Sequence, residues 1–193
     1  MRNCIRCLSA MIVCIFSAAV YAAPPASAPK SALNYTNVDV GVWSTELNGS
    51  SLSGQGLMVR GSMAVHPNVF LAAELSDIGY SHNVDGFLWG IGAGGHMPVT
   101  NTLDVVGKLE FLHQNVDGRD GENGYSLHVT VRGFVVDRLE VEGGIRQAHF
   151  KDSGNDTSVT GEGRYFFTNR IAGGVLLQLG DTNSFGVVGR FTF

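Results

Sequence analysis

Apolar and polar side chains alternate along most of the chain with a period of two residues. From Leu33 onward, segments of about ten residues follow this pattern, and stretches rich in Gly, Asn and Asp separate them. A period of two places successive side chains on opposite faces of a strand. The pattern predicts ten strands, with an eight-strand count as the alternative if two hairpins are misassigned. The predicted strands are 33–46, 55–65, 69–80, 86–97, 103–115, 124–135, 139–151, 158–167, 171–180 and 184–193.

The alternation gives these strands one apolar face and one charged face. The apolar face includes Val40, Leu109 and Val187, and no Asp, Glu, Lys or Arg interrupts it. A basic residue on a lipid-facing position would cost about 2–4 kcal/mol at mid-bilayer, so the charges are expected to face a protected interior. The residues of the charged face are Asp39, Arg60, Glu74, Asp104, Lys108, Glu110, Arg132, Glu140, Glu142, Arg146, Glu162, Arg164 and Arg190.

Alternation alone also fits a secreted barrel with its apolar face inward. Strand length and connection length favour a membrane instead, because ten to twelve tilted residues cross about 25 Å of hydrocarbon. The connections alternate between tight ones, such as 66–68, and longer polar ones, such as 116–123. Aromatic residues lie near both ends of the apolar face, as in interfacial girdles. They are Phe87, Phe111, Tyr125 and Phe185 at one end and Tyr165, Phe167, Phe191 and Phe193 at the other.

The sequence therefore predicts an all-β fold, an antiparallel up-and-down transmembrane β-barrel formed by residues 33–193. The charges on its inner face nearly balance, which indicates mutual ion pairs that close a narrow lumen rather than a selectivity ring of one sign. Strand glycines such as Gly92 and Gly94 would leave room for large neighbours across the lumen. A conducting path is the alternative interpretation.

The chain begins with a predicted signal peptide, residues 1–22. Arg2 and Arg6 precede an apolar run over 10–20 that is too short for a membrane-spanning helix. Residues 23–32 are rich in Pro, Ala and Ser and predict a flexible tether. Removal of the leader leaves 11 basic and 17 acidic residues, a net charge of −6, which disfavours nucleic acid as a partner.

Candidate chemistry in the mature chain is sparse. All three cysteines lie in the leader, so neither a disulfide nor a thiolate metal site is expected, and we predict no cofactor and no metal. His128 and Thr130 share a strand face, but no serine nucleophile accompanies them, so a lipid-modifying enzyme is the weakest of the alternatives. We expect no enzymatic activity. The acidic loop residues lack the regular spacing of a calcium loop and predict solvated side chains: Asp117, Asp120, Glu122, Asp152 and Asp156.

The last predicted strand ends on "GRFTF", with Phe191 and Phe193 two residues apart. The final strand of outer-membrane barrels carries such a terminal aromatic pair and an upstream glycine, which the barrel-assembly machinery recognises. Gly189 is the nearest glycine, displaced by one residue from the usual spacing. We therefore predict an assembly signal formed by Gly189, Phe191 and Phe193.

Four stretches resemble known barrel sequences: "GSMAVHPNVF" (61–70), "NVDGFLWGIGAGG" (83–95), "GYSLHVTVRG" (124–133) and the "VGRFTF" ending. They resemble small outer-membrane β-barrels of the OmpA/OmpX-like, porin-type superfamily. The similarity is greater to a gammaproteobacterial barrel family linked to quorum sensing and plant immune recognition. This resemblance implies a protein exported by the Sec pathway to the outer membrane of a Gram-negative bacterium, and it supplies no catalytic residues.

Two functions follow as expectations. The first is a structural, adhesion or surface-interaction role with a charge-plugged lumen, and the second is a narrow passive channel for small solutes. The expected partners are outer-membrane lipids and lipopolysaccharide, the assembly machinery, and a host or surface ligand at the loops.

Overall fold

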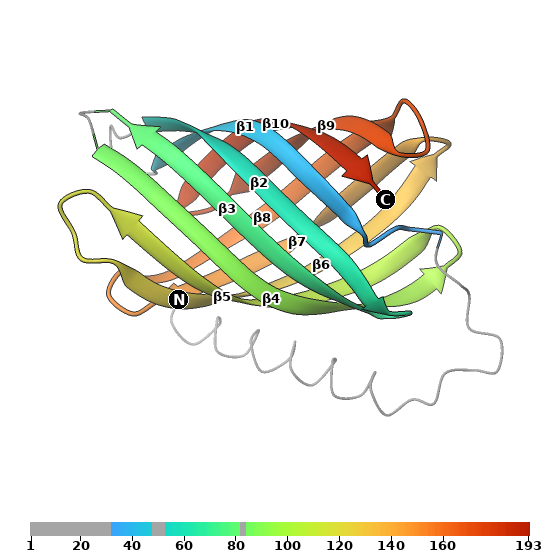
Figure 1. Cartoon of the computed structure of the whole chain (residues 1–193), viewed down its shortest axis with the longest axis horizontal. Helices are drawn as coiled ribbons and strands as arrows, with labels where there is room; N and C mark the ends of the chain where they lie inside the picture. The colour runs from blue at the N-terminus through green and yellow to red at the C-terminus, as the bar shows by residue number, and fades with distance from the viewer. Residues whose placement is uncertain (1–31, 48–52, 82–83) are drawn as a thin grey trace.

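Ten antiparallel strands form a closed barrel in the computed structural model, which describes residues 32–47, 53–81 and 84–193 (Figure 1). The predicted signal peptide and all of the predicted tether except Ala32 lie outside these residues. The described ranges contain no helix long and apolar enough to cross a bilayer. The strands are β1 (Asn37–Leu47), β2 (Ser53–His66), β3 (Val69–Tyr80), β4 (Val84–Thr100), β5 (Leu103–Val116), β6 (Glu122–Val136), β7 (Leu139–Phe150), β8 (Gly154–Phe166), β9 (Ile171–Leu179) and β10 (Thr182–Thr192).

Each strand pairs with its sequence neighbours, and β1 pairs with β10 to close the sheet. Following the register once around the barrel displaces the position on β1 by about 12 residues. For ten strands this shear corresponds to a strand tilt of about 40°, within the range of transmembrane barrels. The prediction of ten strands is confirmed, and the alternative of eight is wrong.

The apolar face of the barrel is its outer surface. Contrary to the sequence expectation, acidic residues do occur on it: Glu46 of β1 and Asp77 of β3 are exposed on this face near the loop end. Leu109 is 58% exposed and Val187 is 52% exposed, whereas Asp104 and Glu110, on the opposite face, are fully buried. A surface of this kind is stable against acyl chains and unfavourable in water. The aromatic residues predicted as girdles are all exposed on the outer surface, near the two ends of the strands. The prediction of a transmembrane antiparallel barrel is confirmed.

The connections differ less in length than the sequence predicted. At the end that carries residues 32 and 193, here called the terminal end, the hairpins span 67–68, 101–102, 137–138 and 167–170. At the opposite end, here called the loop end, they include 117–121 and 151–153, shorter than the predicted loops 116–123 and 152–157. The difference arises because polar residues continue the ladder beyond the apolar zone, as in the pairs Gln147 with Thr157 and Ala148 with Asp156.

The start of the first strand is also corrected. The predicted strand began at Leu33, but β1 begins at Asn37, and residues 32–36 cross the terminal end of the barrel to the β4–β5 turn, where the backbone nitrogen of Ala32 donates to the oxygen of Asn101. The side chains of Leu33 and Tyr35 are buried there against Phe70 and Val106. The sequence pattern predicted a strand that starts too early, because Leu33 and Tyr35 continue the two-residue alternation of the inward-facing residues of β1.

Glycines on the inner face of β4 leave space for side chains of neighbouring strands. A Cβ atom added to Gly92 would lie 2.7 Å from Cγ of Glu110, and one added to Gly94 would lie 2.3 Å from the ring of Phe70. Some strand glycines face outward; around Gly161, for example, no atom lies within 4 Å of an added Cβ. Gly92 and Gly94 therefore leave room for large inward side chains, as the sequence analysis expected of strand glycines.

We expect Gly94→Ala to destabilise the barrel by about 1–3 kcal/mol, because the new methyl group displaces the Phe70 ring from its packed position. The free energy of unfolding, measured by denaturant titration in lipid vesicles, tests this. Gly161→Ala is the matched control, since its methyl group would point into open space. Equal effects of the two substitutions would contradict this account of the glycine positions.

Candidate functional site

The lumen holds a cluster of buried ion pairs around Arg164 on β8. Its guanidinium contacts three carboxylates, those of Glu140 at 2.5 Å, Glu142 at 3.2 Å and Glu162. Only 2% of the Arg164 side chain is exposed. The planar guanidinium suits this geometry because it presents several donors in fixed directions. Arg164 thereby joins carboxylates of two neighbouring strands, β7 and β8.

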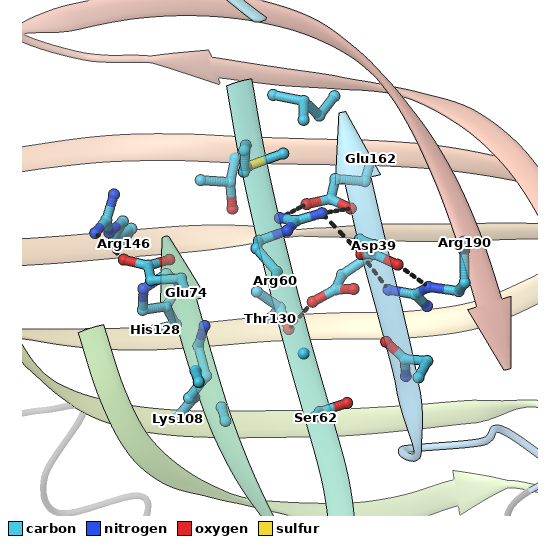
Figure 2. A pocket seen from close by; sticks show the side chains of 18 of the residues that line it. Asp39, Arg60, Ser62, Glu74, Lys108, His128, Thr130, Arg146, Glu162 and Arg190 are labelled. Carbon is cyan, nitrogen blue, oxygen red and sulfur yellow. Dashed lines mark hydrogen bonds and ion pairs between the residues drawn. The ribbon is translucent and has the colours of Figure 1, made fainter. Parts of the chain in front are cut away.

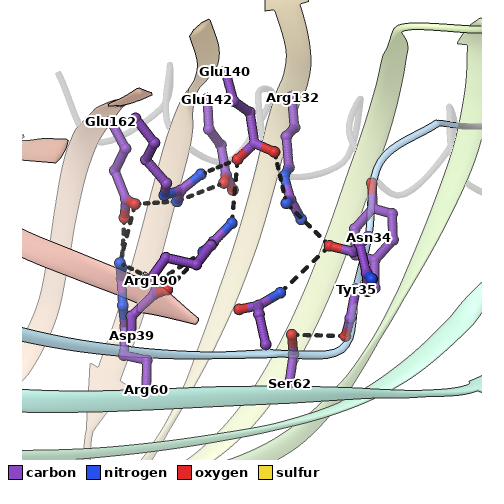
Figure 3. A network of polar contacts seen from close by, with 12 residues as sticks. Asn34, Tyr35, Asp39, Arg60, Ser62, Arg132, Glu140, Glu142, Glu162 and Arg190 are labelled. Atoms are coloured by element: carbon purple, nitrogen blue, oxygen red, sulfur yellow. Dashed lines mark hydrogen bonds and ion pairs between the residues drawn. The ribbon is translucent and has the colours of Figure 1, made fainter. Parts of the chain in front are cut away.

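A second set of contacts connects Asp39 on β1, Arg60 on β2 and Arg190 on β10 to this cluster. Arg60 donates to Oε1 of Glu162 at 2.5 Å and to Oδ2 of Asp39 at 3.0 Å. Arg190 donates through Nε to Oδ1 of Asp39 at 2.6 Å and reaches Glu140 at 3.2 Å (Figure 3). Residues far apart in the sequence therefore bind one another inside the barrel. Which residues of opposite strands lie at the same height in the lumen depends on the shear of the barrel.

Arg132 completes the group, here called the central cluster. It donates to Oε2 of Glu140 at 2.9 Å and to the backbone oxygen of Asn34 at 3.1 Å. The charges of the central cluster balance, four carboxylates against four guanidinium groups, which compensates for their removal from water. Its members are Asp39, Arg60, Arg132, Glu140, Glu142, Glu162, Arg164 and Arg190.

Four other predicted lumen charges lie apart from the central cluster. Lys108 contacts Oε1 of the fully buried Glu110 at 2.9 Å. Arg146 on β7 contacts Oε1 of Glu74 on β3 at 3.3 Å, across the barrel. Figure 2 shows Glu74, Arg146 and Lys108 on one side of the lumen and Arg60, Asp39 and Glu162 on the other. The interior is therefore divided between two charged groups instead of being filled by one.

The last predicted charge, Asp104, binds the segment that precedes β1. The Tyr35 hydroxyl donates to Oδ2 of Asp104 at 2.7 Å, and Nδ1 of His96 lies 2.8 Å from the same oxygen. The Tyr35 ring stacks on His96 with ring centroids 4.0 Å apart and on Phe70 at 5.2 Å. Burial, together with the hydrogen bond to Asp104, raises the pKa of Tyr35, so its hydroxyl remains a donor across the physiological pH range.

A hollow of about 210 Å³ lies beside the central cluster. Its polar wall includes Lys108 and Arg146, and its apolar wall includes Met58 and Leu176. A second hollow of about 130 Å³ lies toward the loop end, and Trp43, Ile78 and Leu88 line both. The ion pairs therefore do not fill the lumen, which differs from the expectation of a lumen closed by charges alone.

Sequence reasoning missed the apolar side chains of the inner face. Met58, Leu176 and Val188 form one buried cluster, and Leu112, Ala148 and Phe150 form another nearer the loop end. These residues have the same strand parity as the charges, so parity alone could have identified them. Inward apolar residues fill a barrel sector in which no ion pair is made.

The residues considered for catalysis and metal binding do not converge. Nε2 of His128 lies 3.3 Å from Glu110, while Thr130 donates to Glu142 at 3.1 Å. Among the loop acids, Glu122 accepts backbone hydrogen bonds from Asp152 and Ser153. Within the described ranges, no group of three or more His, Cys, Asp or Glu side chains could hold a metal ion.

The predicted assembly signal lies on the outer surface of β10 and just beyond it. Phe191 is 41% exposed and Phe193 is 66% exposed, and their ring centroids are 5.1 Å apart in an edge-to-face arrangement. Gly189 pairs with Val40 on β1, and the backbone nitrogen of Phe193 donates to the oxygen of Thr36. The two rings therefore lie beside the β1–β10 seam of the closed barrel.

No family model matches the chain, and no curated protein matches it. Solved structures similar to it include the KdgM porin in complex with disordered oligogalacturonate, with 10% identity, 81% of this chain and 99% of that chain covered, and a TM-score of 0.49. The N-terminal β-barrel domain of Pseudomonas aeruginosa OprF has 14% identity, coverage of 82% and 100%, and a TM-score of 0.46. Neisserial surface protein A has 11% identity, coverage of 82% and 96%, and a TM-score of 0.44.

Proposed function

We propose that this chain is a non-enzymatic integral outer-membrane protein of a Gram-negative bacterium whose native lumen is closed. The observation that carries the proposal is an apolar outer surface around a lumen that ion pairs narrow, from β2 to β8 and from β10 to β7, and that residues 32–36 cover at the terminal end. A closed barrel does not transport solutes, so its role is in envelope structure, adhesion or surface interaction.

The orientation follows from the route of export. A predicted Sec signal delivers the chain to the periplasm, and both described termini lie at one end of the barrel. The terminal end therefore faces the periplasm and the loop end faces outward. Lipids and lipopolysaccharide contact the apolar band, and the assembly machinery binds the last strand through Gly189, Phe191 and Phe193. The resemblance to the family linked to quorum sensing and plant immunity supports a surface role at the loop end.

The proposal predicts that the native protein does not conduct. Purified full-length mature protein, reconstituted into planar bilayers in potassium chloride, is expected to give no current steps above those of protein-free bilayers, because the cross-lumen ion pairs narrow the path and residues 32–36 close it at the terminal end. In the same preparation, unboiled samples are expected to migrate differently from boiled ones on gels, as a folded barrel does. Steady openings in the native protein would support the passive channel and contradict a closed lumen.

A further inference from the structure

The two hollows of the lumen adjoin one another, and the smaller one reaches residues at the loop end such as Tyr80 and Thr182. Trp43, Ile78 and Leu88 line both hollows, so the two adjoin one another along the barrel. The larger hollow is bounded by Tyr35, Phe70 and Val106, where the segment before β1 crosses the mouth. This segment, residues 32–36, separates the interior from the terminal end.

We infer that residues 32–36 are a plug and that the barrel conducts small cations when this plug is displaced. The inference rests on the proposed function, because it explains how a barrel with a hollow lumen is closed in its native state. It adds a latent activity, cation conduction, and assigns its control to a segment outside the strands.

The plug is held by side chains of the barrel wall and, at its two ends, by backbone hydrogen bonds from Ala32 to Asn101 and from Phe193 to Thr36. The Tyr35 ring stacks with the rings of Phe70 and His96, and the guanidinium carbon of Arg132 lies 4.8 Å from the centroid of the Tyr35 ring. The Ser62 hydroxyl donates to the backbone oxygen of Tyr35 at 2.8 Å. Leu33 adds a second buried apolar side chain, 7% exposed, in the same cluster. Leu33 and Tyr35 therefore fill space that no strand residue occupies.

The interior behind the plug has the character of a water-filled space. Three buried polar atoms around the hollows have no hydrogen-bond partner within the protein: Nε1 of Trp43, Oγ of Ser76 and Nε of Arg146. Buried polar atoms of this kind are satisfied by water. A volume of about 210 Å³ exceeds the roughly 30 Å³ share of one liquid water severalfold. This space can therefore hold several water molecules.

The charge at the loop end selects the sign of the conducted ion. The lumen charges nearly cancel, whereas carboxylates outnumber basic side chains on the described part of the loop-end rim, and such a field concentrates cations at the entrance. The acidic residues of this rim are Glu46, Asp77, Asp85, Asp117, Asp120, Glu122, Asp152, Asp156 and Asp181, and its basic residues are Arg119 and Lys151.

The test uses the Leu33→Ala/Tyr35→Ala double variant of the full-length chain in planar bilayers, beside the native protein. We expect discrete current steps from the double variant and none from the native protein. In a potassium chloride gradient the reversal potential should have the sign that indicates preference for potassium over chloride. Heat-modifiable migration verifies that each variant has folded. Tyr35→Phe keeps the ring and removes only the hydroxyl, so it should remain silent.

Leu112→Ala is the matched control, because Leu112 is a fully buried inward residue that lies away from the plug, near the loop end. It removes the same side-chain volume as Leu33→Ala and leaves the plug intact, so it should remain silent. A folded but silent double variant, a conducting Leu112→Ala variant or a preference for chloride would overturn the inference while leaving the closed native barrel in place. Conduction by the native protein would instead overturn the proposed function.

Discussion

Replacement of Arg164 by methionine is expected to destabilise the barrel by about 3–5 kcal/mol. The substitution keeps an unbranched side chain but leaves Glu140, Glu142 and Glu162 without their shared cation in a buried site. Removal of one partner from a buried charged group is costly because the remaining charges are neither solvated nor compensated. Denaturant unfolding in lipid vesicles, followed by the fluorescence of the two tryptophans, measures the change in the free energy of unfolding.

Two further variants separate charge from geometry. Arg164→Lys keeps the charge, but its single nitrogen cannot replace the two guanidinium nitrogens that bind Glu140 on one side and Glu142 and Glu162 on the other, so we expect an intermediate loss. Addition of Glu142→Gln to Arg164→Met removes the carboxylate that has Arg164 as its ion-pair partner, whereas Glu162 keeps Arg60, and should recover part of the stability. Arg119→Gln, in the exposed loop 117–121, is the control and should change stability by less than about 0.5 kcal/mol. If Arg164→Met behaved like this control, the central cluster would not stabilise the fold.

The strands could be predicted from the sequence because a period of two fixes both the conformation and the face of each residue. A register error of one residue would turn the apolar side chains inward, so the alternation is strongly constrained wherever one surface meets lipid. The sequence predicted strand 69–80 with its observed bounds and placed Leu109 outward and Glu110 inward. Strand ends were less well predicted, since polar residues can continue the ladder beyond the apolar zone, as Asn155 does opposite His149.

The pairing of the lumen charges could not be predicted. Parity places Arg60 and Glu162 on the inner face but says nothing of which carboxylate a given arginine meets, because that depends on the shear and on residues about one hundred positions away. The plug was missed for a related reason. Leu33 and Tyr35 continue the alternation of β1, and only their apolar character at inward positions distinguishes them from strand residues. Phe70 and Val106, apolar and inward at the same end, were the signal that could have located their packing partners.

Introduction of a charge on the outer surface is expected to have the second large effect. Leu109 lies near the middle of β5, is 58% exposed, and has Ala93 and Leu127 as its neighbours across the two adjacent strands. Leu109→Arg should lower the free energy of unfolding by about 2–4 kcal/mol, because the guanidinium would enter the hydrocarbon near the bilayer midplane. Reversible denaturant titration in vesicles measures the difference from the native protein.

The matched control is Asn115→Arg on the same strand and the same face. Asn115 is exposed near the loop end, where the polar interface solvates the new charge, so the expected cost is about 0–1 kcal/mol. The gradient between the two positions distinguishes a membrane-spanning barrel from a water-soluble one. If the barrel were in water, both Leu109→Arg and Asn115→Arg would change the free energy of unfolding by less than about 0.5 kcal/mol, because both side chains would already face solvent. Equal and small effects at Leu109 and Asn115 would therefore show that the apolar surface does not face lipid, and neither the closed membrane barrel nor its plug would then stand.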